Sequence, residues 1–331
     1  MGKFKKRINH YLNGVLNPDS YHGFGKSGPF FEGWYFKLIN PDGSQRWTII
    51  PGVYIGAKPE DSHSFIQVMN GVSGKAVYID FPYSQFKSDD KGFHVAIGKN
   101  KFSAKQIHLE INNEEIHLEG NLVFSGLTPW PVAWHSPGIM GWFAWVPGME
   151  CYHGVVSLDH EITGELLIND QATDFSNGRG YIEKDWGKAM PKAWIWSQCN
   201  HFSQSQTSLT VSAAVIPWGP LSFEGFIVGL LINGTLHRFA TYTGARIEKK
   251  TVNEGDVTLV FRDRKTRLEV HARRIGGGQL KAPTITQMDR RILETLSSEI
   301  DVILSVRQNG TWRKVFEDSG RYAGLEVVGD L

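Results

Sequence analysis

The sequence is poor in several features that would mark common classes of protein. It holds only two cysteines in 331 residues, and Cys151 and Cys199 have neither a disulfide framework nor the spacing of a zinc finger. No apolar run reaches the roughly 18 residues that a membrane span needs. The net charge is +1, and lysine and arginine are scattered along the chain. Because a nucleic-acid-binding surface usually shows as a basic stripe, we expect no nucleic-acid partner.

Missing motifs exclude further activities. There is no Gly-x-Ser-x-Gly elbow, no Walker A loop and no His-Glu-x-x-His pair, which argues against a serine hydrolase, a nucleotide-binding protein and a zincin. The N-terminus, Met-Gly-Lys-Phe-Lys-Lys-Arg, is basic but is not followed by the apolar stretch of a signal peptide. We therefore expect a cytoplasmic protein. The basic start is compatible with peripheral contact at a membrane.

Aromatic residues and glycine are abundant instead. Eleven Trp, ten Tyr and nineteen Phe accompany 36 Gly, a composition that favours an all-β fold. An Asp-Gly pair at 42–43 separates predicted strands at 31–39 and 46–54, and Asn-Gly pairs at 233–234 and 309–310 indicate two further hairpin turns. The length predicts two domains, which we divide as residues 1–170 and 171–331, at the polar stretch 169–178.

One segment near the end has the apolar spacing of a helix. Between Thr284 and Ser297 the apolar positions fall on one helical face, which predicts a short helix covering one end of a barrel. These positions are Ile285, Met288, Ile292, Leu293 and Leu296.

A predicted hairpin at residues 107–119 places two histidines and two glutamates on its polar face. They are His108, Glu110, His117 and Glu119. Such a set could bind a metal ion, but simple alternation on a solvated strand produces the same pattern, and this second interpretation is favoured.

The first of three segments that mix tryptophan with ionisable residues is at 29–37. On a strand, Glu32, Trp34 and Phe36 share one face. A carboxyl group desolvated by two aromatic rings would have a raised pKa and could act as a general acid. The alternative is that Glu32 forms an ion pair with an arginine or lysine across the sheet.

The second segment, at 130–153, contains four tryptophans and several prolines, which disfavour a regular helix or a central strand. It predicts an aromatic loop that closes a ligand pocket with Trp142 and Trp145, followed by Glu150 and His153. The alternative is a core plug without a ligand.

The third segment, at 180–202, places Tyr181, Glu183 and Asp185 shortly before a second strand. On that strand Trp194, Trp196 and Gln198 share one face, together with Asn200. Broad π surfaces and neutral amides suit a ring that carries oxygen atoms. A structural ion pair with Lys184 is the alternative for the two acids.

These segments resemble the tocopherol cyclase family, whose members close the chromanol ring of vitamin E. The resemblance extends over nearly the whole chain in family order, although the block 149–154 differs from the family pattern. It is carried by Phe31-Glu32-Gly33-Trp34-Tyr35-Phe36, Gly141-Trp142-Phe143-Ala144 with Pro147, Glu183-Lys184-Asp185-Trp186-Gly187, Pro191, Lys192, Trp194, Trp196, Gln198, Cys199 and Asn200, Leu268-Glu269 with Ala272-Arg273, Leu280-Lys281-Ala282-Pro283-Thr284, and residues 323–329.

The resemblance implies a two-part lipocalin-like fold, with barrel or sandwich halves, that holds a hydrophobic small molecule near the domain junction. It also implies protonation of a prenyl alkene while a phenol attacks the resulting cation, without a metal or any other cofactor. Asp185 is the first choice for the acid and Glu32 the second, with Glu183 and His153 as further catalytic candidates. The candidate substrate-binding residues are Trp34, Phe36, Trp142, Trp145, Glu150, Tyr181, Trp186, Trp194, Trp196, Gln198 and Asn200.

Two other functions remain open from the sequence. A non-catalytic isoprenoid carrier would need the aromatic pocket but no buried acid, and a hydratase would add water to the protonated alkene. The sequence leaves the substrate and the oligomeric state undetermined.

Overall fold

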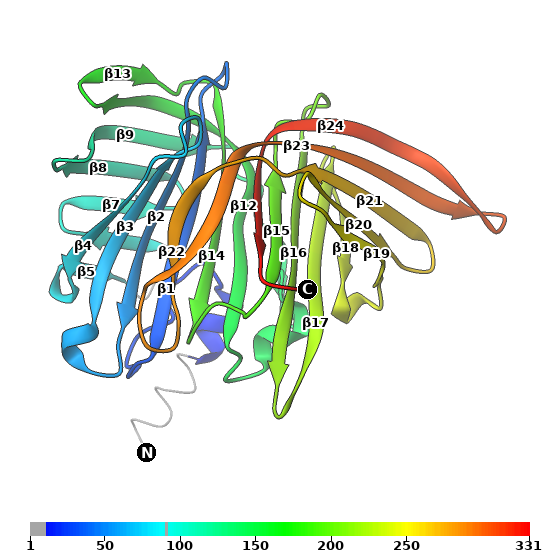
Figure 1. Cartoon of the computed structure of the whole chain (residues 1–331), viewed down its shortest axis with the longest axis horizontal. Coiled ribbons are helices and arrows are strands. Elements are labelled where there is room, and N and C mark those ends of the chain that lie inside the picture. The colour runs from blue at the N-terminus through cyan, green and yellow to red at the C-terminus, as the bar shows by residue number, and fades with distance from the viewer. Residues whose placement is uncertain (1–10, 90–91) are drawn as a thin grey trace. The chain divides into compact units, whose positions relative to one another are not determined.

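A computed structural model describes residues 11–89 and 92–331, and its regular structure is dominated by antiparallel β-sheet (Figure 1). The all-β prediction is confirmed. The chain divides into two compact units. Unit 1 takes the residues up to Met69, Ala76–Met190 and Leu280–Arg291, and unit 2 takes Asn70–Lys75, Pro191–Gln279 and Ile292–Leu331. The stretch 169–178, where the sequence suggested a boundary, lies inside unit 1.

One sheet has twelve strands, which lie almost entirely in unit 1. In hydrogen-bonded order they are β4 (Ala76–Pro82), β3 (His63–Asn70), β2 (Arg46–Ile55), β1 (Phe30–Ile39), β14 (Gly178–Gly187), β12 (Cys151–Ile168), β9 (His117–Ser125), β8 (Gln106–Asn112), β7 (Asn100–Ser103), β6 (His94–Ile97) and β5 (Phe86–Ser88), with β13 (Gln171–Asp174) beside β12.

A second sheet has ten strands. Their order is β18 (Thr235–Ala240), β17 (Leu221–Ile232), β16 (Thr207–Trp218), β15 (Trp194–Cys199), β24 (Thr311–Val328), β23 (Arg290–Gln308), β21 (Thr266–Arg273), β20 (Asp256–Arg262) and β19 (Arg246–Val252), with β22 (Gly278–Ala282) beside β23. The short strands β10 (Val132–Ala133) and β11 (Ser136–Pro137) form a separate pair. Single 3₁₀ turns are η1 (Pro59–Asp61), η2 (Tyr83–Gln85), η3 (Gly141–Trp145) and η4 (Thr241–Thr243), and residues 11–16 are helical.

Both sheets curl until their two edge strands are neighbours in the sequence. In the first sheet the edges are β4 and β5, which η2 joins, and in the second they are β18 and β19, which η4 joins (Figure 1). Within the part of the chain that is described, neither pair of edges is hydrogen-bonded. The barrels that we expected are therefore not closed by β-pairing. Instead, a short turn of the chain connects the two edge strands of each sheet.

Each unit has its own apolar core on one face of its sheet. In unit 1 this core includes the fully buried Trp34 and Phe36, and in unit 2 it includes Ile195 and Phe261. The Asn-Gly turns are confirmed, because Asn233 and Asn309 both have positive φ angles, as a tight hairpin turn requires. Among the described residues, no helix has the length and apolar composition that a bilayer span requires.

The predicted helix at 284–297 is wrong. Residues 284–289 form an irregular turn, and β23 begins at Arg290. The apolar residues fit a strand equally well, because Ile292 and Leu296 are buried while Leu293 is 48% exposed. Pairing with β24 supplies the backbone hydrogen bonds, and this tertiary contact overrides the local helical spacing.

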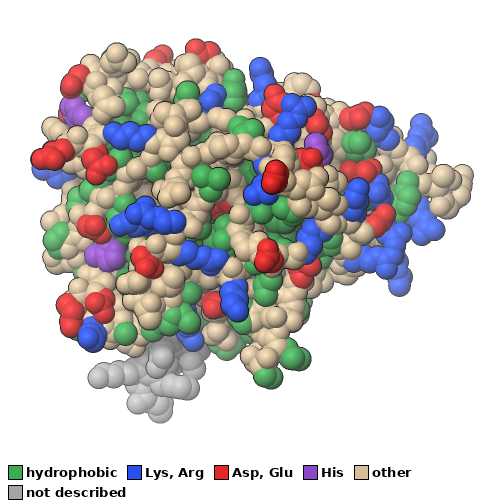
Figure 2. Space-filling view, in the orientation of Figure 1, with side chains coloured by type: hydrophobic (Ala, Val, Ile, Leu, Met, Phe, Trp, Pro, Cys, Tyr) green, Lys and Arg blue, Asp and Glu red, His purple; other side chains and the backbone are tan. Residues whose placement is uncertain are grey.

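The polar face of the hairpin at 106–125 is exposed to solvent, which agrees with the interpretation favoured from the sequence over a metal site. Glu110 and Glu119 lie opposite each other on β8 and β9, and both are exposed. Acidic and basic side chains lie interspersed on the part of the face in Figure 2 that carries the strands of unit 1.

A buried histidine gives unit 1 a dependence on pH. His160 on β12 pairs with Gly180 on β14, and burial lowers the pKa of its imidazole from 6.5 to about 3. In the interval between these two values the unfolded chain binds a proton that the folded chain excludes, so the free energy of unfolding falls as the pH falls. The shift corresponds to about 3 kcal/mol lost between about pH 7 and pH 4.

Replacing His160 by Gln should remove most of this loss. We expect urea denaturation to give a free energy of unfolding that falls by about 3 kcal/mol less in His160→Gln than in the unchanged chain over that pH interval. An equal fall in both proteins would show that His160 does not couple folding to protons.

Candidate active site

Strand β14 lies between β1 and β12, and its side chains alternate between two faces of the sheet. Lys184 of β14 pairs with Trp34 of β1 and with Gly154 of β12. Asp185 pairs with Gly33 of β1 and with His153 of β12. Because directly paired residues share a face, the two faces of this sheet carry different groups. Lys184 and Trp186 belong to the core face, and Glu183 and Asp185 belong to the opposite face.

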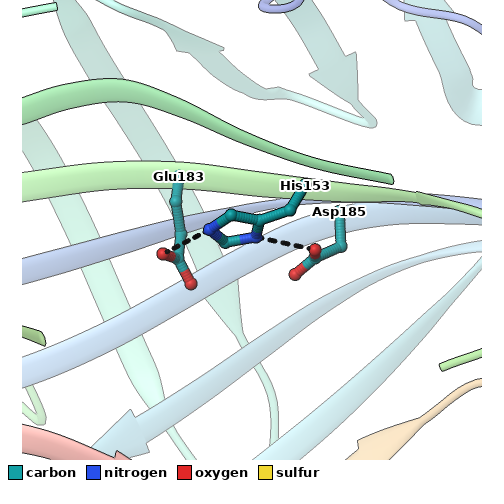
Figure 3. Close-up of side chains that lie close together, drawn as sticks. All are labelled: His153, Glu183 and Asp185. Carbon is teal, nitrogen blue, oxygen red and sulfur yellow. Dashed lines mark hydrogen bonds and ion pairs between the residues drawn. The ribbon is translucent and has the colours of Figure 1, made fainter. Parts of the chain in front are cut away.

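On the opposite face an imidazole lies between two carboxylates. His153 Nδ1 is 2.9 Å from Asp185 Oδ1, and its Nε2 is 3.4 Å from Glu183 Oε2 (Figure 3). The Tyr181 hydroxyl donates a 2.5 Å hydrogen bond to the same Glu183 oxygen. The sequence predicted all four residues as site residues, and the pairing of β12 with β14 brings them together.

The three side chains of this triad, which we define as His153, Glu183 and Asp185, differ in their exposure to solvent. The side chain of Glu183 is 5% exposed, that of His153 is 10% exposed and that of Asp185 is 27% exposed. A proton on the imidazole can therefore pass between an inner and an outer carboxylate, and the outer one is the more exposed to solvent.

The triad also has the residue types of a metal site, since its ligand atoms lie within 4.8 Å of one another. However, each ring nitrogen of His153 faces a different carboxylate, so the two acids lie on opposite sides of the ring (Figure 3). Because each ring nitrogen has its own carboxylate beside it, this arrangement also suits proton transfer through the imidazole.

Cys151 lies at the outer end of the triad, with its Sγ 3.9 Å from Asp185 Oδ1. Burial, reinforced by the negative charge of Asp185, raises the pKa of this thiol well above its usual range. Because the thiolate is the nucleophilic form, Cys151 is not an activated nucleophile.

On the core face, Glu32 forms the ion pair that we considered as the alternative to a general acid. Its partner is Lys184 on β14, and both side chains are fully buried. His22 adds a second contact, with its Nδ1 3.1 Å from Glu32 Oε1 and its backbone N–H donating to Oε2 at 2.8 Å.

The electrostatics of this pair favour the ionised carboxylate of Glu32. Burial acts to raise the pKa of Glu32, but the charges of Lys184 and His22 outweigh it and hold the pKa below its usual value. Burial lowers the pKa of Lys184, and Glu32 opposes that change. Glu32 is therefore an ion-pair partner and not a stored neutral acid.

Aromatic rings enclose the buried ammonium group. Lys184 Nζ is 4.7 Å from the ring centroid of Trp34 and 4.8 Å from that of Trp186, and it donates to the Ser20 carbonyl at 2.6 Å. Trp186 is itself stacked between His22 and Tyr152. Lys184, His22 and Ser20 were not identified from the sequence as site residues; the signal that could have indicated Lys184 is its place between Ile182 and Trp186 on an apolar strand face.

The remaining predicted residues occupy four other places. Trp34 and Phe36 pack in the core of unit 1, where Trp34 is stacked on Phe93 with ring centroids 5.3 Å apart. Trp142 and Trp145 belong to η3, in an irregular loop as predicted. Glu150 precedes β12, and burial raises its pKa although Arg290 and Lys188 oppose the change.

The predicted ligand-facing strand is β15 in unit 2. Trp194, Trp196 and Gln198 are all buried, as is Asn200, and the Trp194 indole donates a 2.5 Å hydrogen bond to Glu326. Glu326 was not identified from the sequence. As predicted by alternation, these side chains lie on the face opposite the core residues Ile195 and Cys199.

A family model described as tocopherol cyclase-like matches residues 124–329. The chain belongs to the tocopherol cyclase-like family. The match includes the triad and all of β15, so the motif Glu183-Lys184-Asp185-Trp186-Gly187 lies inside the family region.

Two plant proteins are similar to this family member over much of its length. A protein of Oryza sativa subsp. japonica named "Probable tocopherol cyclase, chloroplastic" is 23% identical over 93% of this chain and 77% of its own. A protein of Zea mays named "Tocopherol cyclase, chloroplastic" is 24% identical over 68% of this chain and 58% of its own.

Among solved structures, the crystal structure of CghA with Sch210972 has the same fold. The TM-score is 0.54 at 14% sequence identity, and the match covers 91% of this chain and 89% of CghA. Another crystal structure of CghA matches with a TM-score of 0.53. At this identity the likeness establishes the two-part β fold of the tocopherol cyclase-like chain and nothing about its substrate.

Proposed function

We propose that this protein is an intramolecular cyclase that closes a chromanol-type ring on a prenylated hydroquinone. The observation that carries the proposal is the triad, in which His153 joins Glu183 to the more exposed Asp185 within the family region. A carrier of the same fold would have no use for such a proton-transfer group.

The proposed reaction is an isomerisation. A proton adds to one carbon of the trisubstituted prenyl alkene, and the tertiary cation that forms at the other carbon is attacked by a phenol oxygen. The new C–O bond closes the ring, and the phenol proton leaves. Because one proton enters and one departs, substrate and product have the same mass, and no external electron acceptor takes part.

Each residue of the triad has its own role in these proton transfers. Asp185, as the most exposed member, donates the proton to the alkene, and His153 holds the Asp185 carboxyl through Nδ1. The proton released by the phenol returns through the same carboxyl and imidazole. Tyr181 fixes Glu183, which stabilises the protonated imidazole from its other side.

The proposal leaves Glu32 out of the proton transfer, because Lys184 and His22 keep it ionised.

The test is anaerobic incubation of the purified protein with a panel of prenylated hydroquinones, followed by chromatography and mass spectrometry. We expect a product of unchanged mass and shifted retention. A mass gain of one water would replace the proposal with a hydratase, and recovery of unreacted, protein-bound quinol would replace it with a carrier.

A further inference from the structure

Unit 1 carries large apolar side chains that its own fold leaves in solvent. The most exposed is Trp134 at 77%, and Trp142 is 48% exposed. Together with neighbouring residues they form what we name the aromatic surface. It consists of Leu12, Leu16, Val132, Trp134 and Trp142.

Hydrogen bonds tie the two parts of this surface together. The Tyr11 hydroxyl, in the helical residues 11–16, donates to the Trp145 carbonyl at 2.8 Å, and the Trp145 indole donates to the Trp134 carbonyl at 2.8 Å. Trp142 is stacked on Phe143 with ring centroids 4.1 Å apart. Trp134 also contacts the ring of His135 edge-on, with centroids 5.6 Å apart. The rings are thus held in place while much of their area stays exposed, as in a surface that binds a partner.

The helical residues face outward with their apolar side. Leu12 and Leu16 are one helical turn apart and are 41% and 39% exposed, whereas Val15 between them is buried. A helix that served only the fold would bury the leucines. The two leucines therefore extend the exposed apolar area that the loop at 130–145 begins.

The distribution of charged residues along the sequence favours one kind of partner for the aromatic surface. From Gly120 to Met149 the sequence contains no Asp, Glu, Lys or Arg. The first sixteen residues contain Lys3, Lys5, Lys6 and Arg7 and no acidic residue. An uncharged aromatic surface, in a chain whose first sixteen residues have only basic charges, complements a membrane with an apolar interior and negatively charged headgroups.

We propose that the aromatic surface docks on the headgroup region of an anionic lipid bilayer. Tryptophan rings settle at the boundary between headgroups and acyl chains, with leucine beside them, and nearby lysines attract acidic lipids. A second copy of the chain is a poorer partner, because its first sixteen residues have the same basic side chains and no acidic residue that would complement them. The proposal does not depend on the reaction proposed above.

The test uses the full chain with vesicles of phosphatidylcholine alone and vesicles that also contain phosphatidylserine. We expect co-flotation with the mixed vesicles, weakened by salt, and a blue shift of the tryptophan emission. The double variant Trp134→Ser with Trp142→Ser should lower the partition coefficient on the order of tenfold or more. Both residues are exposed, so thermal unfolding should confirm that the variant is folded.

Val123→Ser is the matched control, because it removes another exposed apolar side chain of unit 1, 50% exposed on β9. It should leave the partition unchanged. Absence of vesicle binding by the unchanged chain, or equal binding by the double variant, would overturn the proposal. So would a dimer, seen by sedimentation velocity, that the double variant abolishes, since the surface would then belong to a second copy.

Discussion

Replacing Asp185 by Asn is expected to lower the rate of ring closure about 10³-fold, which is the size of contribution that a positioned general acid makes. The amide keeps the shape of the carboxyl group but has no acidic proton to give to the alkene. Binding should change little, because the amide oxygen can still accept a hydrogen bond from His153. The measurement is single-turnover conversion of a prenylated hydroquinone, together with the Kd of the same compound for each protein.

A second His–Asp neighbourhood in unit 1 provides the control for Asp185→Asn. His63 Nε2 lies 3.6 Å from Asp80 Oδ1, and the Asp80 side chain is 66% exposed. Asp80→Asn removes a carboxylate beside a histidine without touching the triad, so we expect unchanged turnover. If Asp185→Asn and Asp80→Asn both turn over at the original rate, Asp185 has no part in the chemistry.

Replacing Lys184 by Met should destabilise unit 1 by about 3–5 kcal/mol, because it leaves the Glu32 carboxylate buried without its main counter-charge. Methionine has nearly the same shape as the apolar stem of lysine, so packing against Trp34 and Trp186 should be preserved. Urea denaturation would give the free energy of unfolding. Lys99→Met offers the comparison, since the ion pair of Lys99 with Glu110 is exposed to solvent and its loss should change the free energy of unfolding far less.

A double variant separates charge from packing at this pair. Lys184→Met combined with Glu32→Gln removes both charges, and we expect it to be more stable than Lys184→Met alone. A double variant as unstable as the sum of the two single variants would show that each side chain acts through its own packing and that the ion pair contributes little.

Local alternation let the sequence predict which residues share a face. It placed Glu32 with Trp34 and Trp194 with Trp196, because side chains two positions apart on a strand point the same way. It could not decide whether Glu32 was an acid or an ion-pair partner. That depends on Lys184, 152 residues away, and on the register between β1 and β14, which no local pattern reveals.

The candidate triad was predicted as residues but not as an arrangement. His153 reaches Asp185 through the pairing of β12 with β14, and irregularities in that pairing lie only a few residues further along. His22 was missed for a different reason: it lies in an irregular stretch with no periodic pattern. The helix at 284–297 was wrong because apolar spacing alone does not distinguish a helix from a strand when the strand's partner is distant in sequence.

Strand β14 makes the spacing of its residues as informative as their identity. Within four consecutive positions, odd-numbered Glu183 and Asp185 belong to the triad, while even-numbered Lys184 and Trp186 belong to the buried ion pair and its aromatic surroundings. Inserting or deleting one residue here would send each group to the wrong face, placing the ammonium beside the imidazole and the acids in the apolar core. Single substitutions in this strand can damage one function at a time, whereas a change of length would damage both together.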